Sequence, residues 1–98
     1  MYSVLVVDDE IRQREAIIGN VDWQRAGFEV VGGAENGIEA LDLLEKLEPD
    51  LVLTDIKMPG LSGLDLVEKL SEPGRVLEFI LLTGYADFEY AHRALSHR

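Results

Sequence analysis

One stretch near the start of the chain decides the fold: Val4-Leu5-Val6-Val7-Asp8-Asp9-Glu10. Its first four residues are continuously apolar, and this pattern is typical of a strand that helices cover on both faces of a parallel sheet. Three carboxylates follow where that strand ends. We therefore expect a buried central strand with an acidic carboxyl end.

Three further short apolar runs predict strands. They are Phe28–Val31, Leu51–Thr54 and Val76–Thr83. The segments between the runs are long enough for the helical crossovers that parallel strands need. Strand and helix alternate four times, which with right-handed crossovers predicts an α/β fold built on an open, doubly wound parallel sheet.

Apolar residues at helical spacing mark the crossovers. They recur over residues 40–47 and 63–70, and residues 88–95 predict a last helix. Pro49 predicts the end of the helix over 40–47. After the first strand the stripe is less regular, because Arg14 interrupts a set of apolar positions: Ile11, Ile17, Ile18 and Val21.

Length and composition restrict the class of protein. Ninety-eight residues, 47% of them hydrophobic, fit one small domain with its own core, and we place it over residues 1–98. Nineteen acidic and nine basic residues give a net charge of −10, so we expect neither direct nucleic-acid binding nor a membrane partner. The chain has no cysteine, which excludes thiolate metal sites. Its start lacks a secretory signal, and we expect a cytoplasmic protein.

Carboxylates stand at the ends of two predicted strands. Asp8 and Asp9 follow the first strand, and Asp55 follows the third. If these strands are neighbours where the winding of the sheet reverses, their carboxyl ends meet in one crevice. Carboxylates so close together repel each other unless a cation neutralises them, and an all-oxygen set of ligands favours Mg²⁺. We therefore expect a Mg²⁺ site there.

A carboxylate beside Mg²⁺ can act as a nucleophile toward phosphorus and form an aspartyl phosphate. Asp55 suits this role because it stands alone at a strand end, whereas Asp9 suits a direct metal ligand and Asp8 a group that holds a metal-bound water. Thr83, at the end of the fourth strand, suits a hydroxyl that binds a phosphoryl oxygen. In the competing interpretation, the acids of residues 8–10 only cap the following helix.

Three stretches resemble the receiver domains of bacterial two-component response regulators. They are Val4-Leu5-Val6-Val7-Asp8-Asp9-Glu10, Leu51-Val52-Leu53-Thr54-Asp55-Ile56-Lys57-Met58-Pro59-Gly60 and Leu81-Leu82-Thr83-Gly84. The resemblance implies a flavodoxin-like sheet with strand order 2-1-3-4 and a sensor histidine kinase as partner. It further implies Asp55 as phosphoacceptor, Asp8 and Asp9 as the acidic pair that binds Mg²⁺, the backbone carbonyl of Lys57 as a further metal ligand, and Thr83 as the switch hydroxyl.

Two stretches are similar to receivers joined to AraC-type DNA-binding domains: Val21-Asp22-Trp23 with Gly27-Phe28, and Gly84-Tyr85-Ala86-Asp87-Phe88-Glu89-Tyr90-Ala91. This resemblance implies transcription regulation through an output domain that these residues do not include. Receivers continue into a fifth strand, which ends in a lysine, and a fifth helix, so we expect a chain truncated at its C-terminus. The fourth strand would then be an edge, and we expect a homodimer through it or the adjacent faces.

Two other functions stay open beside that of a phosphorylated receiver. One is a truncated fragment that binds metal and interacts with partners but does not signal. The other is an enzyme, a Mg²⁺-dependent aspartyl phosphatase, although such enzymes resemble Asp-x-Asp where this chain has Asp8-Asp9-Glu10. We expect a signalling receiver whose chemistry is its own phosphorylation and dephosphorylation, and not an enzyme that turns over a metabolite.

Overall fold

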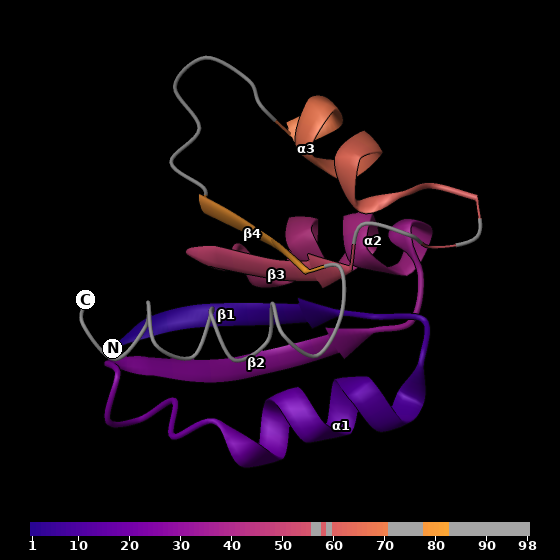
Figure 1. Ribbon diagram of the computed structural model, residues 1–98. Coiled ribbons are helices and arrows are strands. Elements are labelled where there is room, and N and C mark those ends of the chain that lie inside the picture. Colours follow the sequence, from indigo (N-terminus) through magenta and orange to yellow (C-terminus); the bar gives the residue numbers. More distant parts are fainter. Residues whose placement is uncertain (56–57, 59, 71–77, 83–98) are drawn as a thin grey trace.

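A computed structural model describes residues 1–55, 58, 60–70 and 78–82. Within these residues, strands and helices alternate along the chain (Figure 1). The strands are β1 (Tyr2–Val7), β2 (Phe28–Ala34), β3 (Leu51–Asp55) and β4 (Glu78–Leu82), and the helices are α1 (Ile11–Asn20), α2 (Gly37–Leu47) and α3 (Gly63–Leu70).

The four strands form one parallel sheet in the order β2-β1-β3-β4. This confirms the predicted fold class and strand order. Helix α1 lies on one face of the sheet, and α2 and α3 lie on the other (Figure 1). The winding therefore reverses between β1 and β3, which are hydrogen-bonded neighbours, and ligands of such sheets bind at the carboxyl ends beside that reversal.

Strand β1 is buried on both faces, as its sequence predicts. Val4 and Val6 pack in a cluster on the α1 side with Ile17. Leu5 and Val7 pack on the other side, in a cluster with three residues of α2 and α3: Ala40, Leu44 and Leu66. Full burial of such a side chain contributes about 1.5–3 kcal/mol, so both clusters fix the position of the acidic residues that follow β1.

Strand β2 contains one residue more than the segment of β1 that it pairs with. Val4 lies opposite Val30, but Leu5 lies opposite Gly32, so Val31 is inserted as a β-bulge. Because side chains alternate between the faces of a sheet, one inserted residue inverts the faces of everything after it. Even-numbered residues of β2 therefore face one side of the sheet before Val31 and the other side after it.

The packing of β2 shows this inversion. Phe28 and Val30 lie on the α1 side, whereas Ala34 packs on the opposite side. Gly33 faces α1, because a Cβ atom there would lie 3.4 Å from Cδ of Arg14 and 3.6 Å from Cδ1 of Ile18. The sequence predicts an end of this strand at Val31, but the ladder to β1 continues to Ala34. The prediction ended the strand too early because the next two residues are glycines, which are typical of turns.

Helix α1 differs at one residue, Ile11, from its predicted apolar stripe. Ile17 is fully buried, and Ile18 packs against the same cluster. Ile11 is 57% exposed, so its predicted place in the buried stripe is wrong: it is the first residue of the helix and its side chain faces solvent. Val21 follows the helix and is buried, as is Trp23, whose indole N–H donates to the carbonyl oxygen of Ile17 at 3.1 Å.

Helix α2 ends at Leu47, two residues before Pro49, as predicted. Glu48 takes a left-handed conformation with φ of 46°, and its N–H donates to the carbonyl oxygen of Leu44 at 3.1 Å. A left-handed residue after the last turn is a common helix end, but glycine is the usual residue there. The proline and this turn together direct the chain into β3.

Strand β4 covers the described part of the fourth predicted strand. Residues 76, 77 and 83 of that prediction lie outside the described residues, as does the helix predicted over 88–95. Among the described strands β4 is outermost on its side, and the homodimer expected through it stays a prediction. None of the helices in the described part of the chain is long and apolar enough to cross a membrane.

Candidate functional site

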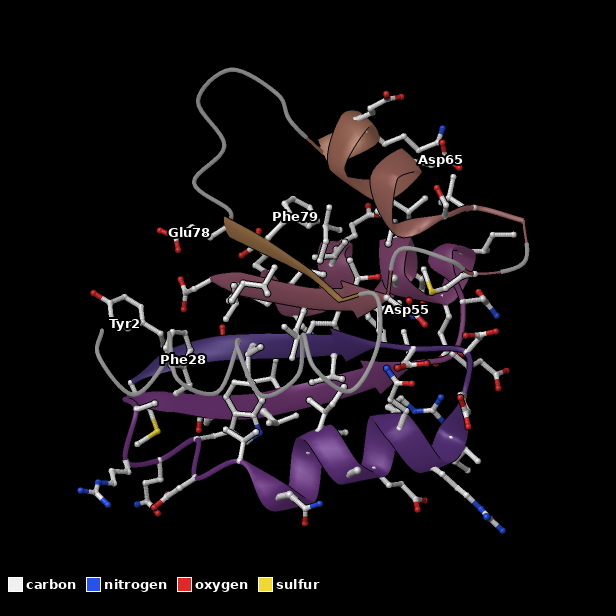
Figure 2. All side chains as sticks on the ribbon, viewed as in Figure 1. Tyr2, Phe28, Asp55, Asp65, Glu78 and Phe79 are labelled. Carbon is white, nitrogen blue, oxygen red and sulfur yellow. The ribbon has the colours of Figure 1, made fainter. Side chains whose placement is uncertain are left out.

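The fold brings together the three carboxylates that the sequence predicts to meet. Val7 lies opposite Thr54 in the β1–β3 ladder, so the residues that end these strands are neighbours. Asp8, Asp9 and Asp55 each offer one carboxylate oxygen, and these three oxygens lie within 4.8 Å of one another. Asp55 stands at the carboxyl end of β3, away from the edge where β4 begins with Glu78 (Figure 2). We call Asp8, Asp9 and Asp55 the acidic triad.

Asp8 is the buried member of the acidic triad, with no exposed surface. Its main-chain N–H donates to the carbonyl oxygen of Ala34 at 2.9 Å, and its Oδ1 accepts from the N–H of Glu10 at 2.9 Å. Its Oδ2 is buried and has no hydrogen-bond partner among the described residues. A buried carboxylate oxygen without a partner is costly, so this atom indicates a ligand position.

Electrostatics at Asp8 lead to the same conclusion. Burial, together with the negative charges of Asp55, Asp9 and Glu10, raises the pKa of Asp8 to about 6, although the hydrogen bond from the N–H of Glu10 opposes the shift. At neutral pH the carboxyl group is nevertheless ionised. The folded protein therefore carries a repulsion between carboxylates that a bound cation would relieve.

The other two members of the acidic triad differ from Asp8 in exposure. Asp9 is exposed and Asp55 is half-buried. Thr54, which is fully buried, donates its hydroxyl to the main-chain oxygen of Asp55 at 3.1 Å. A second molecule can thus reach Asp55 from solvent while β3 holds its backbone in place.

The chemistry of the acidic triad fits Mg²⁺. All its donor atoms are carboxylate oxygens, which are the ligands of hard divalent cations. Mg²⁺ uses one or two carboxylates and completes its octahedron with water or phosphate oxygens. The unpartnered Oδ2 of Asp8 and the exposed carboxylate of Asp9 would supply such ligands.

Two predicted site residues, Lys57 and Thr83, lie outside the described residues. One residue that contacts the site was not predicted from the sequence. Arg14 donates from Nη1 to the main-chain oxygen of Asp8 at 2.7 Å. Its position in an otherwise apolar stripe was the signal for such a role.

A comparison with protein families identifies the domain. The family model of the response regulator receiver domain matches residues 4–98. The chain belongs to this receiver family. Its members act in signalling, in agreement with the function class that the sequence predicts.

Relatives of this receiver among curated proteins include bacterial regulators. The uncharacterized transcriptional regulatory protein YesN of Bacillus subtilis is 38% identical over 97 residues, and the transcriptional regulatory protein HptR of Staphylococcus aureus is 35% identical over the same length. The matches cover 99% of this chain but only 26% of YesN and 38% of HptR. The chain therefore spans less than two-fifths of the length of these relatives.

Solved structures relate this receiver to AraC-type regulators, as the sequence predicts. The receiver domain of AraT from Geobacillus stearothermophilus is 37% identical with a TM-score of 0.78, and the match covers 99% of this chain and 75% of that one. A two-component transcriptional regulator AraC from Clostridium phytofermentans is 33% identical with a TM-score of 0.78, covering 100% and 76% of the two chains. The matches support a place in two-component transcription regulation.

Proposed function

We propose that residues 1–98 form a receiver domain that a sensor histidine kinase phosphorylates on Asp55 in the presence of Mg²⁺. The observation that carries the proposal is the acidic triad, whose oxygens come within 4.8 Å of one another at the point where the winding of the sheet reverses. Membership of the receiver family supports it. Helix capping alone gives no reason for Asp55, from β3, to lie beside Asp8 and Asp9.

In the proposed reaction a carboxylate oxygen of Asp55 attacks the phosphorus of a phosphohistidine. An O–P bond forms, the P–N bond to the histidine breaks, and its electron pair stays on the imidazole nitrogen. A bound Mg²⁺ supplies positive charge beside the transferring phosphoryl group. Asp8 and Asp9 would hold that ion, and Asp55, which is half-buried at the end of β3, would be the reacting group.

Two residues outside the described part of the chain complete the proposed site. The main-chain oxygen of Lys57 is proposed as a further metal ligand, and the hydroxyl of Thr83 as the donor to a phosphoryl oxygen. Both assignments rest on the resemblance to other receivers. Substitution of Thr83 by alanine tests the second one, because it removes only the hydroxyl and the methyl group.

In the full regulator, we propose that phosphorylation controls a DNA-binding output domain in the cytoplasm. The names of the relatives, which are transcriptional regulators, support this role. The receiver itself carries a net charge of −10, which repels the phosphates of DNA. We therefore assign contact with DNA to the output domain alone.

The experiment is intact-mass measurement after incubation with acetyl phosphate and Mg²⁺. Wild-type protein should gain one phosphoryl group that hydroxylamine removes, as expected for an acyl phosphate. D55N should gain none. D42N is the matched control, because Asp42 is an exposed aspartate on α2 and its loss should leave the modification unchanged. Equal modification of D55N and wild type would exclude Asp55 as the acceptor.

The same samples separate the receiver from the phosphatase alternative. A receiver gains one phosphoryl group per chain and releases phosphate only as that group hydrolyses. A phosphatase would release phosphate from many different phosphoesters over repeated turnovers. Sustained release with several phosphoesters would therefore favour the enzyme.

A further inference from the structure

Arg14 joins the first turn of α1 to the end of β1. Its main-chain N–H donates to the carbonyl oxygen of Glu10 at 3.0 Å, the first bond of the helix. Its side chain turns back, and Nη1 donates to the main-chain oxygen of Asp8 at 2.7 Å. A hydrogen bond from a guanidinium group is about twice as strong as a neutral one, so this contact restrains the peptide that follows Asp8.

With that bond, three residues hold the polar atoms of Asp8. Its N–H is held by Ala34 of β2, its main-chain oxygen by Arg14 of α1, and its Oδ1 by the N–H of Glu10. Within the described chain, Oδ2 is left without a hydrogen bond. The orientation of Oδ2 is thus fixed by the bonds that the other atoms make.

We propose that Arg14 is a positioning residue of the Mg²⁺ site, which holds the backbone of Asp8 so that Oδ2 faces the cation. The inference rests on the proposed function, because it assigns a role to Arg14 only if the acidic triad binds a divalent cation. Arg14 touches the main chain of a ligand and not the ion. Residues that hydrogen-bond a metal ligand, rather than the metal, typically lower the metal affinity 10- to 100-fold when they are lost.

The conformation of Arg14 is set by packing over Gly33. A Cβ atom on Gly33 would lie 3.4 Å from Cδ of Arg14 and 3.7 Å from its Nε, so the side chain of Arg14 lies over this glycine. The β-bulge at Val31 puts Gly33 on the α1 side of the sheet. The half-buried side chain of Arg14 is therefore held both by packing against Gly33 and by its hydrogen bond to Asp8.

A role through charge alone predicts the opposite effect. A positive charge beside the acidic triad repels a divalent cation, so its removal would strengthen Mg²⁺ binding. Loss of a positioning bond would instead weaken Mg²⁺ binding, because the ligand becomes less ordered. The sign of the change in affinity therefore separates the two roles.

The test is calorimetric titration of the 98-residue chain with Mg²⁺ alone, at neutral pH. R14M and R14Q should both bind Mg²⁺ roughly tenfold more weakly than wild type. R14K should recover part of the affinity, because lysine keeps a charged donor. R12M is the matched control: Arg12 is an exposed arginine on the same helix, and its loss removes the same charge while leaving the contact to Asp8 in place, so affinity should stay near that of wild type.

Amide hydrogen exchange without metal gives a second measurement. The N–H of Glu10 donates to Asp8 Oδ1. In EDTA, hydrogen exchange of the Glu10 amide should therefore be faster in R14M and R14Q than in wild type, and unchanged in R12M. Wild-type or tighter Mg²⁺ binding by both R14M and R14Q overturns the inference and leaves the proposed function intact. Failure of wild type to bind Mg²⁺ overturns the proposed function and the inference with it.

Discussion

Leu61 lies so close to Gly37, the first residue of α2, that a Cβ atom on Gly37 would be 2.6 Å from Cβ of Leu61 and 2.8 Å from its main-chain oxygen. Real Cβ atoms do not approach each other this closely, so the contact exists only because residue 37 is glycine. Leu61 belongs to the segment between Asp55 and α3. The start of α2 therefore helps to fix the chain that leaves the acidic triad.

G37A should destabilise the protein by about 1–3 kcal/mol, because the backbone near Leu61 must shift to admit a methyl group. Urea unfolding measures the effect. G19A is the control: Gly19 lies in α1 with nothing within 4 Å of an added Cβ, and alanine there should stabilise by about 0.5–1 kcal/mol. Equal effects of the two substitutions would contradict the close contact at Leu61.

D8N should stabilise the metal-free protein at neutral pH. The pKa of Asp8 is raised from 3.8 to about 6 in the folded state, so between these values the unfolded chain loses the proton first and wild-type stability falls as pH rises. Above pH 6 the ionised Asp8 lowers the free energy of unfolding by its full amount, on the order of 2–3 kcal/mol. Asparagine keeps an acceptor for the N–H of Glu10 and carries no charge, so it avoids this cost.

The measurement is urea unfolding of wild type and D8N in EDTA at several pH values. The stability difference between them should be small near pH 4, grow up to about pH 6 and then stay constant. D42N, which removes an exposed carboxylate, should change stability by less than about 1 kcal/mol throughout. A difference between D8N and wild type that is independent of pH would contradict the raised pKa of Asp8.

Mg²⁺ should stabilise wild type and leave D8N nearly unchanged. A ligand that binds only the folded state at 100 times its Kd adds about 2.7 kcal/mol, and EDTA should remove this gain. Thermal unfolding with and without Mg²⁺ measures it. D9N should lose part of the gain and D42N none, so a gain of equal size in wild type, D8N and D9N would place the cation elsewhere.

S62A should weaken the start of α3. Ser62 Oγ accepts from the N–H of Asp65 at 3.2 Å, and Asp65 Oδ2 accepts from the N–H of Ser62 at 3.0 Å, a reciprocal helix cap. The backbone N–H of Ser62 and its hydroxyl hold the pKa of Asp65 below 3.8. Loss of the hydroxyl should cost about 1 kcal/mol and move that pKa toward 3.8 in an NMR titration, whereas S62T should preserve both.

The sequence predicts the sheet and the acidic triad because both depend on local patterns. Continuous apolar runs identify β1 and β3 as strands buried on both faces, and the resemblance to receiver domains implies that they are neighbours. Asp8, Asp9 and Asp55 stand directly at those strand ends, so their meeting follows from the strand order. The bounds of β2 were less predictable, since Gly32 and Gly33 are typical of turns and only the ladder to β1 makes them part of a strand.

Contacts between distant side chains were beyond prediction from the sequence. The burial of Asp8, in contrast to the exposure of Asp9 beside it, depends on which way each residue faces after β1 ends. The return of Arg14 to Asp8 depends on the angle between α1 and the sheet. The helical periodicity indicated only that Arg14 stands at a position where an apolar residue is expected, and not what its side chain contacts.

The insertion at Val31 has an effect far from any carboxylate. Because the bulge takes Val31 out of the ladder, Gly32, Gly33 and Ala34 stay opposite Leu5, Val6 and Val7, and Gly33 lies on the α1 face beneath the side chain of Arg14. The bulge, and not the number of residues along β2, thus sets the face on which Gly33 contacts the arginine of α1.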